Sequence, residues 1–109
     1  IHGVFAFEGK GLEAPFLLDP RATYAVPRDK RAQLIYLRGG NSTDELVIVT
    51  LVRDGKTFRY FPLGAKSGMH VPLAVVEDLF PESKLEVFIA APKGTAGVVV
   101  IDFGIIEVD

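Results

Sequence analysis

The chain has 109 residues, a length that fits one domain with its own core, and we expect a single domain over residues 1–109. It contains no cysteine, which excludes disulfides, thiolate metal sites and a cysteine nucleophile. With 12 basic and 14 acidic residues the formal charge is −2, so the composition offers no electrostatic footprint for nucleic acid.

Hydrophobic residues make up 49% of the chain. No run approaches the ~20 apolar residues that a membrane helix needs, so we expect no membrane insertion. The first residues lack the basic start and apolar core of a signal peptide, and none is expected there. The sequence does not assign a cellular compartment. The apolar excess favours strands buried on both faces, or a subunit interface.

β-rich runs separated by glycine, proline and polar residues extend along the whole chain. In chain order they predict strands at residues 4–8, 24–27, 32–38, 45–53, 56–63, 69–75, 84–91 and 98–108, with a short extended piece at 13–18.

The segment before Pro81 allows two interpretations. We expect the strand at 69–75 to lead into one helical turn at 77–80, and the alternative is a single short helix that starts at Pro72. In either case, seven or eight strands with turn signals every ~8–12 residues are typical of an all-β fold. The sequence therefore predicts an antiparallel β-sandwich, either immunoglobulin-like or jelly-roll-like.

The pair Asp54-Gly55 between two β-rich runs is the strongest local signal, because both central residues of a two-residue hairpin turn take positive φ. Counting outward from this turn places Leu51 opposite Phe58 and Val49 opposite Tyr60. We expect these four side chains to lie on one face and to belong to the core.

The other face of the predicted hairpin mixes apolar, hydroxyl and basic side chains. Such a face needs a cover, which the rest of the chain or a partner must supply. We therefore expect a non-catalytic binding or assembly module that forms a homo-oligomer or docks on a protein partner through this face. Its expected binding residues are Ile48, Thr50, Val52, Thr57, Arg59 and Phe61.

A second class of function is a small-ligand or carbohydrate-binding domain that uses loops at one end of the sandwich. Residues 39–44 and 64–70 flank the hairpin and would supply the polar contacts. The tripeptide at 41–43 fits an N-glycosylation acceptor, which indicates an exposed loop. Because tryptophan is absent, only the three tyrosines offer amphipathic rings for stacking on a sugar.

No catalytic or cofactor motif meets its structural requirements, so we expect no enzyme, no cofactor and no metal site. Residues 9–14 match the spacing of a dinucleotide-binding loop, but Pro15 prevents the helix that must follow. Residues 64–68 resemble part of a phosphate loop without its glycines. His2 and His70 are the only histidines, and nothing in the sequence brings them together.

Asp102 interrupts a last strand that is otherwise apolar on both faces. Burial of an unpaired carboxylate is costly. Asp102 is therefore expected either to be exposed at a strand edge or to pair with an arginine, for which Arg59 is a candidate.

Overall fold

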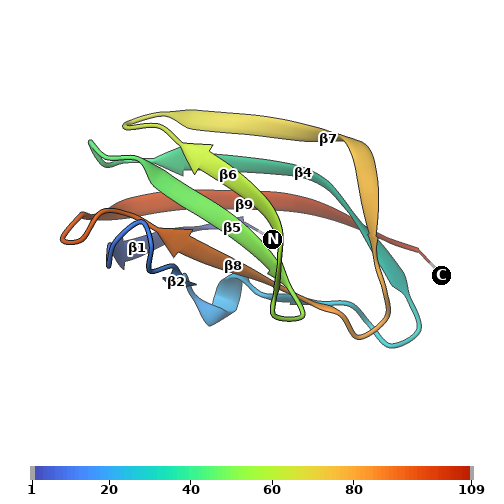
Figure 1. The fold of residues 1–109 in the computed structure, drawn as a ribbon. Coiled ribbons are helices and arrows are strands. Elements are labelled where there is room, and N and C mark those ends of the chain that lie inside the picture. The colour runs from blue at the N-terminus through green and yellow to red at the C-terminus, as the bar shows by residue number, and fades with distance from the viewer. Residues whose placement is uncertain (1, 109) are drawn as a thin grey trace.

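The structure is a computed structural model that describes residues 2–108, including their side chains except those of residues 72–77. Within this range nine strands form two sheets that pack face to face (Figure 1). In spatial order, the four-stranded sheet consists of β1 (His2–Glu8), β9 (Ala96–Val108), β4 (Arg31–Asn41) and β7 (Gly68–Leu79).

The second sheet has five strands, and every pair in both sheets is antiparallel. The prediction of an all-β antiparallel sandwich is therefore confirmed. The five-stranded sheet runs in the order β2 (Phe16–Leu17), β8 (Lys84–Ala90), β5 (Val47–Arg53) and β6 (Lys56–Leu63), with β3 (Tyr24–Ala25) also paired to β8.

The turn at Asp54-Gly55 joins the innermost of a series of nested antiparallel strand pairs. Moving outward from it, β5 pairs with β6, β4 with β7, β2 and β3 with β8, and β1 with β9. Successive pairs alternate between the two sheets, as they do when one long hairpin is rolled up into a jelly roll. Of the two sandwich types predicted, the chain adopts the jelly roll.

The predicted hairpin turn is confirmed, because Asp54 and Gly55 both have positive φ, 50° and 83°. The predicted register is right only next to the turn. Phe58 is an extra residue in β6, and this bulge places Leu51 opposite Arg59 and not opposite Phe58. Beyond a bulge of one residue, every side chain of the strand changes face relative to the unbulged register.

This change of face corrects two predictions about the core. Phe61 is 4% exposed and lies opposite the buried Val49, whereas Tyr60 is 66% exposed and lies on the outside. The expected assignment of Val49 and Leu51 to the core is correct, and Phe58 packs against the core while remaining partly exposed. The bulge therefore replaces Tyr60 by Phe61 in the interior.

The helical turn expected at 77–80 is wrong. β7 continues as a strand to Leu79, because its backbone pairs with β4, with Leu79 opposite Ala32. The single helical turn of the described residues is the 3₁₀ turn η1 (Pro20–Ala22), where the Asp19 carboxylate accepts a hydrogen bond from the backbone N–H of Arg21 at 2.8 Å. The described part of the chain has no helix long and apolar enough to cross a membrane.

The core lies between the two sheets and takes alternate residues of each strand. In β9, Val99, Ile101 and Phe103 are fully buried, so the residues between them point away from the core. Those outward residues, with their neighbours on β1, β4 and β7, form the outer surface of the four-stranded sheet.

Candidate functional site

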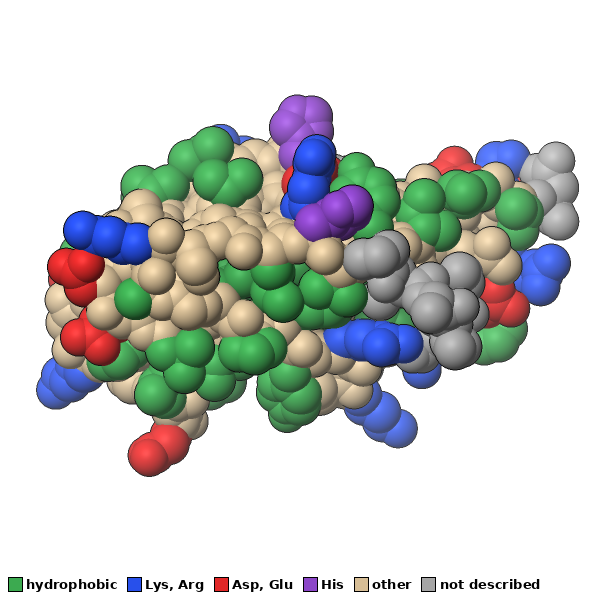
Figure 2. Space-filling model, turned by 90° about the horizontal axis from the view of Figure 1, so that it is seen from above, with side chains coloured by type: hydrophobic (Ala, Val, Ile, Leu, Met, Phe, Trp, Pro, Cys, Tyr) green, Lys and Arg blue, Asp and Glu red, His purple; other side chains and the backbone are tan. Residues whose placement is uncertain are grey.

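Four polar side chains, one from each strand, form a row across the outer surface of the four-stranded sheet. His2 lies opposite Asp102, Asp102 opposite Arg38, and Arg38 opposite His70. Directly opposite residues of paired strands share a face, so all four lie on the same side. We call these four residues the polar row. Figure 2 shows histidine, basic and acidic side chains gathered at one place on the surface.

The centre of the polar row is an ion pair between Arg38 and Asp102. Nη2 and Nε of Arg38 donate to Oδ2 of Asp102 at 2.7 and 3.2 Å, and the hydroxyl of Tyr36 donates to Oδ1 at 3.2 Å. The guanidinium of Arg38, helped by the Tyr36 hydroxyl and opposed by burial, holds the pKa of Asp102 below its usual range. Asp102 therefore stays ionised at neutral pH.

The structure thus answers the question that Asp102 posed in the sequence. Its side chain is 16% exposed and lies in the middle of the sheet, because β9 has β1 on one side and β4 on the other. Its partner is Arg38, directly across in β4. The suggested partner Arg59 belongs to the other sheet.

Tyr36 lies flat on the sheet beside the polar row. Its ring covers the backbone of Gly104, where an added Cβ would come within 2.1 Å of the Tyr36 ring atom Cε2. The rings of Tyr36 and His70 meet edge to face, with the ring planes at 88° and the ring centres 5.6 Å apart. Glycine at position 104 therefore allows the Tyr36 ring to rest on the sheet, and the guanidinium of Arg38 lies over this ring with its Cζ 5.9 Å from the ring centre.

A groove of about 910 Å³ runs along the polar row. On its other side lie Val4, Val100, Gly40 and Gly68, which also oppose one another across the four strands. The two glycines leave β4 and β7 without side chains there, so the surface is hollowed next to Arg38. The volume falls in the range of ~300–1,000 Å³ typical of small-ligand sites.

The polar row does not have the geometry of a metal centre. Among the described residues there is no group of three or more histidine, aspartate or glutamate side chains that could hold an ion. His2 and His70 stand on the two outermost strands, three strand spacings of ~4.8 Å apart. The two imidazoles therefore cannot reach one ion together.

The chain matches no family model, no curated protein and no solved structure. What the two outer surfaces can do therefore follows from their own geometry and chemistry.

The binding residues expected from the hairpin are divided by the bulge. Ile48, Thr50 and Val52 lie on the outer surface of the five-stranded sheet, and Thr57 lies opposite Val52 before the bulge. Arg59 and Phe61 follow the bulge and lie opposite the buried residues Leu51 and Val49. The six residues therefore do not form one continuous surface.

Other residues take the outward places that Arg59 and Phe61 were expected to fill. Tyr60 and Pro62 point outward in β6, and β8 and β2 add Phe88 and Leu17 in the same row as Thr50. We call the resulting surface the apolar face; it consists of Leu17, Ile48, Val52, Tyr60, Pro62 and Phe88, together with Thr50 and Ala90, which point to the same side but are only 6% and 4% exposed.

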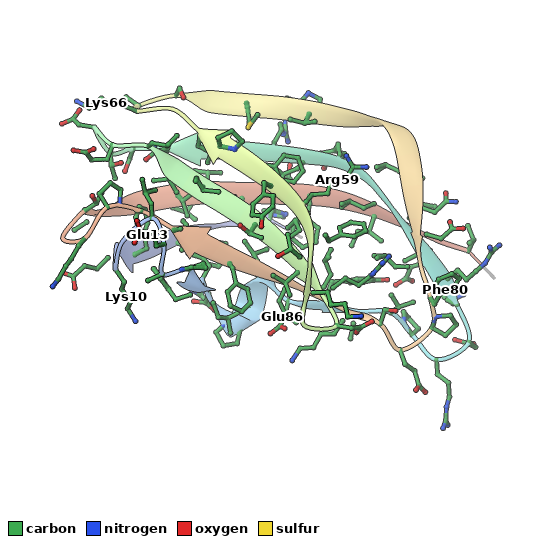
Figure 3. The ribbon with its side chains drawn as sticks, in the orientation of Figure 1. Lys10, Glu13, Arg59, Lys66, Phe80 and Glu86 are labelled. Atoms are coloured by element: carbon green, nitrogen blue, oxygen red, sulfur yellow. The ribbon has the colours of Figure 1, made fainter. Side chains whose placement is uncertain are left out.

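The loops expected to bind a ligand are closely tied together. Asn41 is 4% exposed; its Nδ2 donates to the carbonyl oxygens of Glu45 and Leu63, and its Oδ1 accepts from the N–H of Thr43. The expectation that the acceptor tripeptide is exposed is therefore wrong at Asn41 itself. Lys66 lies at the tip of the next loop, where it pairs with Asp44 at 3.1 Å (Figure 3).

Parts of these two segments nevertheless reach the groove. Gly39, Gly40, Gly68 and His70 line it, as members of the strands β4 and β7 and not of the loops. The alternative prediction therefore named some of the segments that line the groove, but the structure places these residues on a sheet surface and not in loops.

Proposed function

We propose that this chain is a non-catalytic binding module that holds a neutral carbohydrate in the groove beside the polar row. The observation that supports this most is the aromatic ring of Tyr36 directly beside the hydrogen-bonding pair Arg38–Asp102. A sugar ring offers an apolar C–H face that stacks on an aromatic ring, and hydroxyls that bind planar charged groups.

The charges of the site favour a neutral ligand over an anion or a cation. Arg38 and Asp102 compensate each other, so with the two histidines counted as neutral the row carries no formal net charge. A hydroxyl can donate to the carboxylate and accept from the guanidinium at once. A phosphate or carboxylate ligand would find the charge of Arg38 already neutralised by Asp102.

The same ion pair argues for binding without catalysis. An effective proton donor or acceptor needs a pKa near the working pH. The pKa of Asp102 is lowered by Arg38, and its two oxygens already accept hydrogen bonds from Arg38 and Tyr36. The carboxylate is thus suited to hold a hydroxyl in place rather than to move a proton.

A glycan array followed by calorimetry on the best ligands tests this proposal. We expect Tyr36→Ala to bind about five- to tenfold more weakly, since an aromatic contact contributes roughly 1–1.5 kcal/mol and 1.4 kcal/mol corresponds to a factor of ten. Tyr60→Ala is the matched control, because it removes the same residue type from the apolar face. No glycan binding, or equal losses for both variants, would contradict the proposal.

A second candidate function is assembly through the apolar face. Tyr60 is 66% exposed there and is surrounded by Ile48, Pro62 and Phe88. Contiguous apolar surface of this kind is characteristic of protein contacts. Sedimentation over micromolar concentrations should then show a dimer that Tyr60→Glu dissociates and Val4→Glu, on the opposite face, does not. A monomer throughout excludes self-association.

A further inference from the structure

We propose that the groove takes a linear oligosaccharide that lies across the strands, with one sugar unit over each of the four strands. This inference rests on the proposed function. It adds the shape, the direction and the length of the ligand.

The direction follows from the register of the sheet. The members of the polar row are direct cross-strand neighbours, so the row runs perpendicular to the strands. Neighbouring strands are ~4.8 Å apart. This spacing is close to the length that one pyranose unit adds to an extended 1,4-linked chain. An oligosaccharide laid along the row therefore meets a new polar side chain at each unit.

Each position of the row can bind a hydroxyl, in a different way. Asp102 accepts hydrogen bonds, and Arg38, whose side chain is 61% exposed, donates them. At the two ends stand His2 and His70, both exposed, and a neutral imidazole can donate through one nitrogen and accept through the other. The row thus contains donors and acceptors along its whole length.

The two flanks of the row suit the two kinds of surface on a sugar chain. Tyr36 lies on one flank, and Val4 and Val100 on the other are 64% and 43% exposed. These apolar groups can contact the C–H faces of the sugar units. Next to Val100 on the same flank, Gly40 has no side chain and leaves room for the ligand.

The length follows from the ends of the row. His2 and His70 lie on the edge strands β1 and β7, so within residues 2–108 no further strand of the sheet continues the row beyond them. A monosaccharide or disaccharide on Tyr36 and Arg38 would leave the outer histidines unused. A tetrasaccharide is the shortest chain that contacts all four members of the row.

Calorimetry at pH 7.5 with oligosaccharides of one to six units tests the inference, using 1,4-linked chains of glucose, xylose, mannose and N-acetylglucosamine as probes. For the sugar that binds, we expect affinity to rise at least tenfold from two to four units and then to level off. His2→Ala should weaken tetrasaccharide binding several-fold and leave disaccharide binding unchanged. His70→Ala, which also removes a ring contact with Tyr36, should weaken tetrasaccharide binding more than disaccharide binding. Lys66→Ala, an exposed side chain outside the row, is the control.

The outcomes separate the inference from the function on which it rests. If a monosaccharide binds as tightly as the tetrasaccharide, or if the histidine variants weaken all lengths equally, the ligand does not lie across the strands although the groove binds sugar. If affinity still rises beyond four units, the site is longer than the row and the inference is wrong. If none of the probes binds at any length, both proposals fail.

Discussion

The two outer faces of this sandwich are built by the same alternation of residues but are held in order by different forces. On the four-stranded sheet, cross-strand hydrogen bonds from Arg38 and Tyr36 to Asp102 fix the positions of polar groups. On the five-stranded sheet, Tyr60, Phe88 and their apolar neighbours only cover one another.

Because of this difference, the polar row is suited to selective binding of a ligand, whereas the apolar face provides contact area. The polar row presents a few groups in fixed directions beside a hollow, which is how small-ligand sites select their ligands. The apolar face offers mainly apolar side chains and carries no charged group, as the centre of a protein contact does. One jelly roll can thus carry a selective site and a contact surface on opposite sides without interference between them.

The largest effect is expected where the bulge decides what lies inside. Phe61→Ala should lower the free energy of unfolding by about 3–5 kcal/mol, because it empties a buried aromatic site. Its neighbour Tyr60→Ala should cost less than ~1 kcal/mol, because the side chain is 66% exposed. Urea denaturation of both variants measures the difference. Equal losses would mean that β6 has no bulge and that the apolar face is misassigned.

This pair of residues also shows where prediction from sequence ends. The positive φ at Asp54-Gly55 can be predicted from the residue types, and so can the two cross-strand pairs next to the turn. The bulge cannot be predicted from the sequence, because β6 has apolar residues at neighbouring positions and both registers bury an aromatic side chain. Packing against the other sheet, which includes residues distant in the chain, decides between Tyr60 and Phe61.

The second-largest loss of stability is expected at Asn41, a residue that links the two sheets. Asn41 ends β4 of the four-stranded sheet, and its side chain holds the backbone just before β5 and at the end of β6. Asn41→Ala should cost roughly 2–3 kcal/mol, because buried backbone groups lose their partners. Asp44→Ala in the same loop, whose side chain is 81% exposed, should be nearly neutral in urea denaturation.

If the Asn41 variant is as stable as the parent, then the loops do not depend on its amide. In the expected case its folded form should still bind sugar with unchanged affinity. The side chain does not line the groove, so its loss lowers the stability of both faces together without changing what either one recognises.

A smaller effect on stability, but a clear one on binding, is expected at Gly104. Gly104→Ala pushes the Tyr36 ring off the sheet, which should cost about 1–3 kcal/mol and weaken sugar binding about five- to tenfold. Ile106→Ala is the control on the same strand, because Ile106 is 46% exposed and does not line the groove. This substitution at Gly104 displaces the Tyr36 ring beside the polar row and leaves the apolar face unchanged. Equal sugar affinity in the parent and Gly104→Ala would exclude Tyr36 as the ring on which the sugar stacks.

The polar row was only partly visible in the sequence. Asp102 stood out as a lone charge in an apolar strand, and the two histidines were the only ones in the chain. Arg38 and Asp102, however, are 64 positions apart, and no local rule pairs them. One signal could have helped: in a rolled hairpin, residues about equally far from the turn lie opposite. Arg38 and His70 obey it about Asp54-Gly55, and so, more loosely, do His2 and Asp102.

The smallest effect is the pH dependence that distinguishes the charged face from the apolar one. The pKa of Asp102 is lowered in the folded chain, mainly by its hydrogen bond with Arg38. A lowered folded pKa stabilises the fold above the unfolded carboxyl value of ~3.9, and this contribution is lost as the pH falls through the folded pKa. The parent should therefore exceed Asp102→Asn in stability at pH 7, and the gap should shrink below about pH 4.

Thr50→Val on the apolar face provides the comparison, because it changes a buried side chain without removing a titrating group. Its effect on the free energy of unfolding should stay constant between pH 7 and pH 3, whereas that of Asp102→Asn declines. The gap at Asp102 should also decrease with added salt, since Arg38 is exposed enough to be screened. A gap that is independent of pH and salt would mean that Asp102 acts through hydrogen-bond geometry alone, and the contrast between a charged and an uncharged face would lose its electrostatic basis.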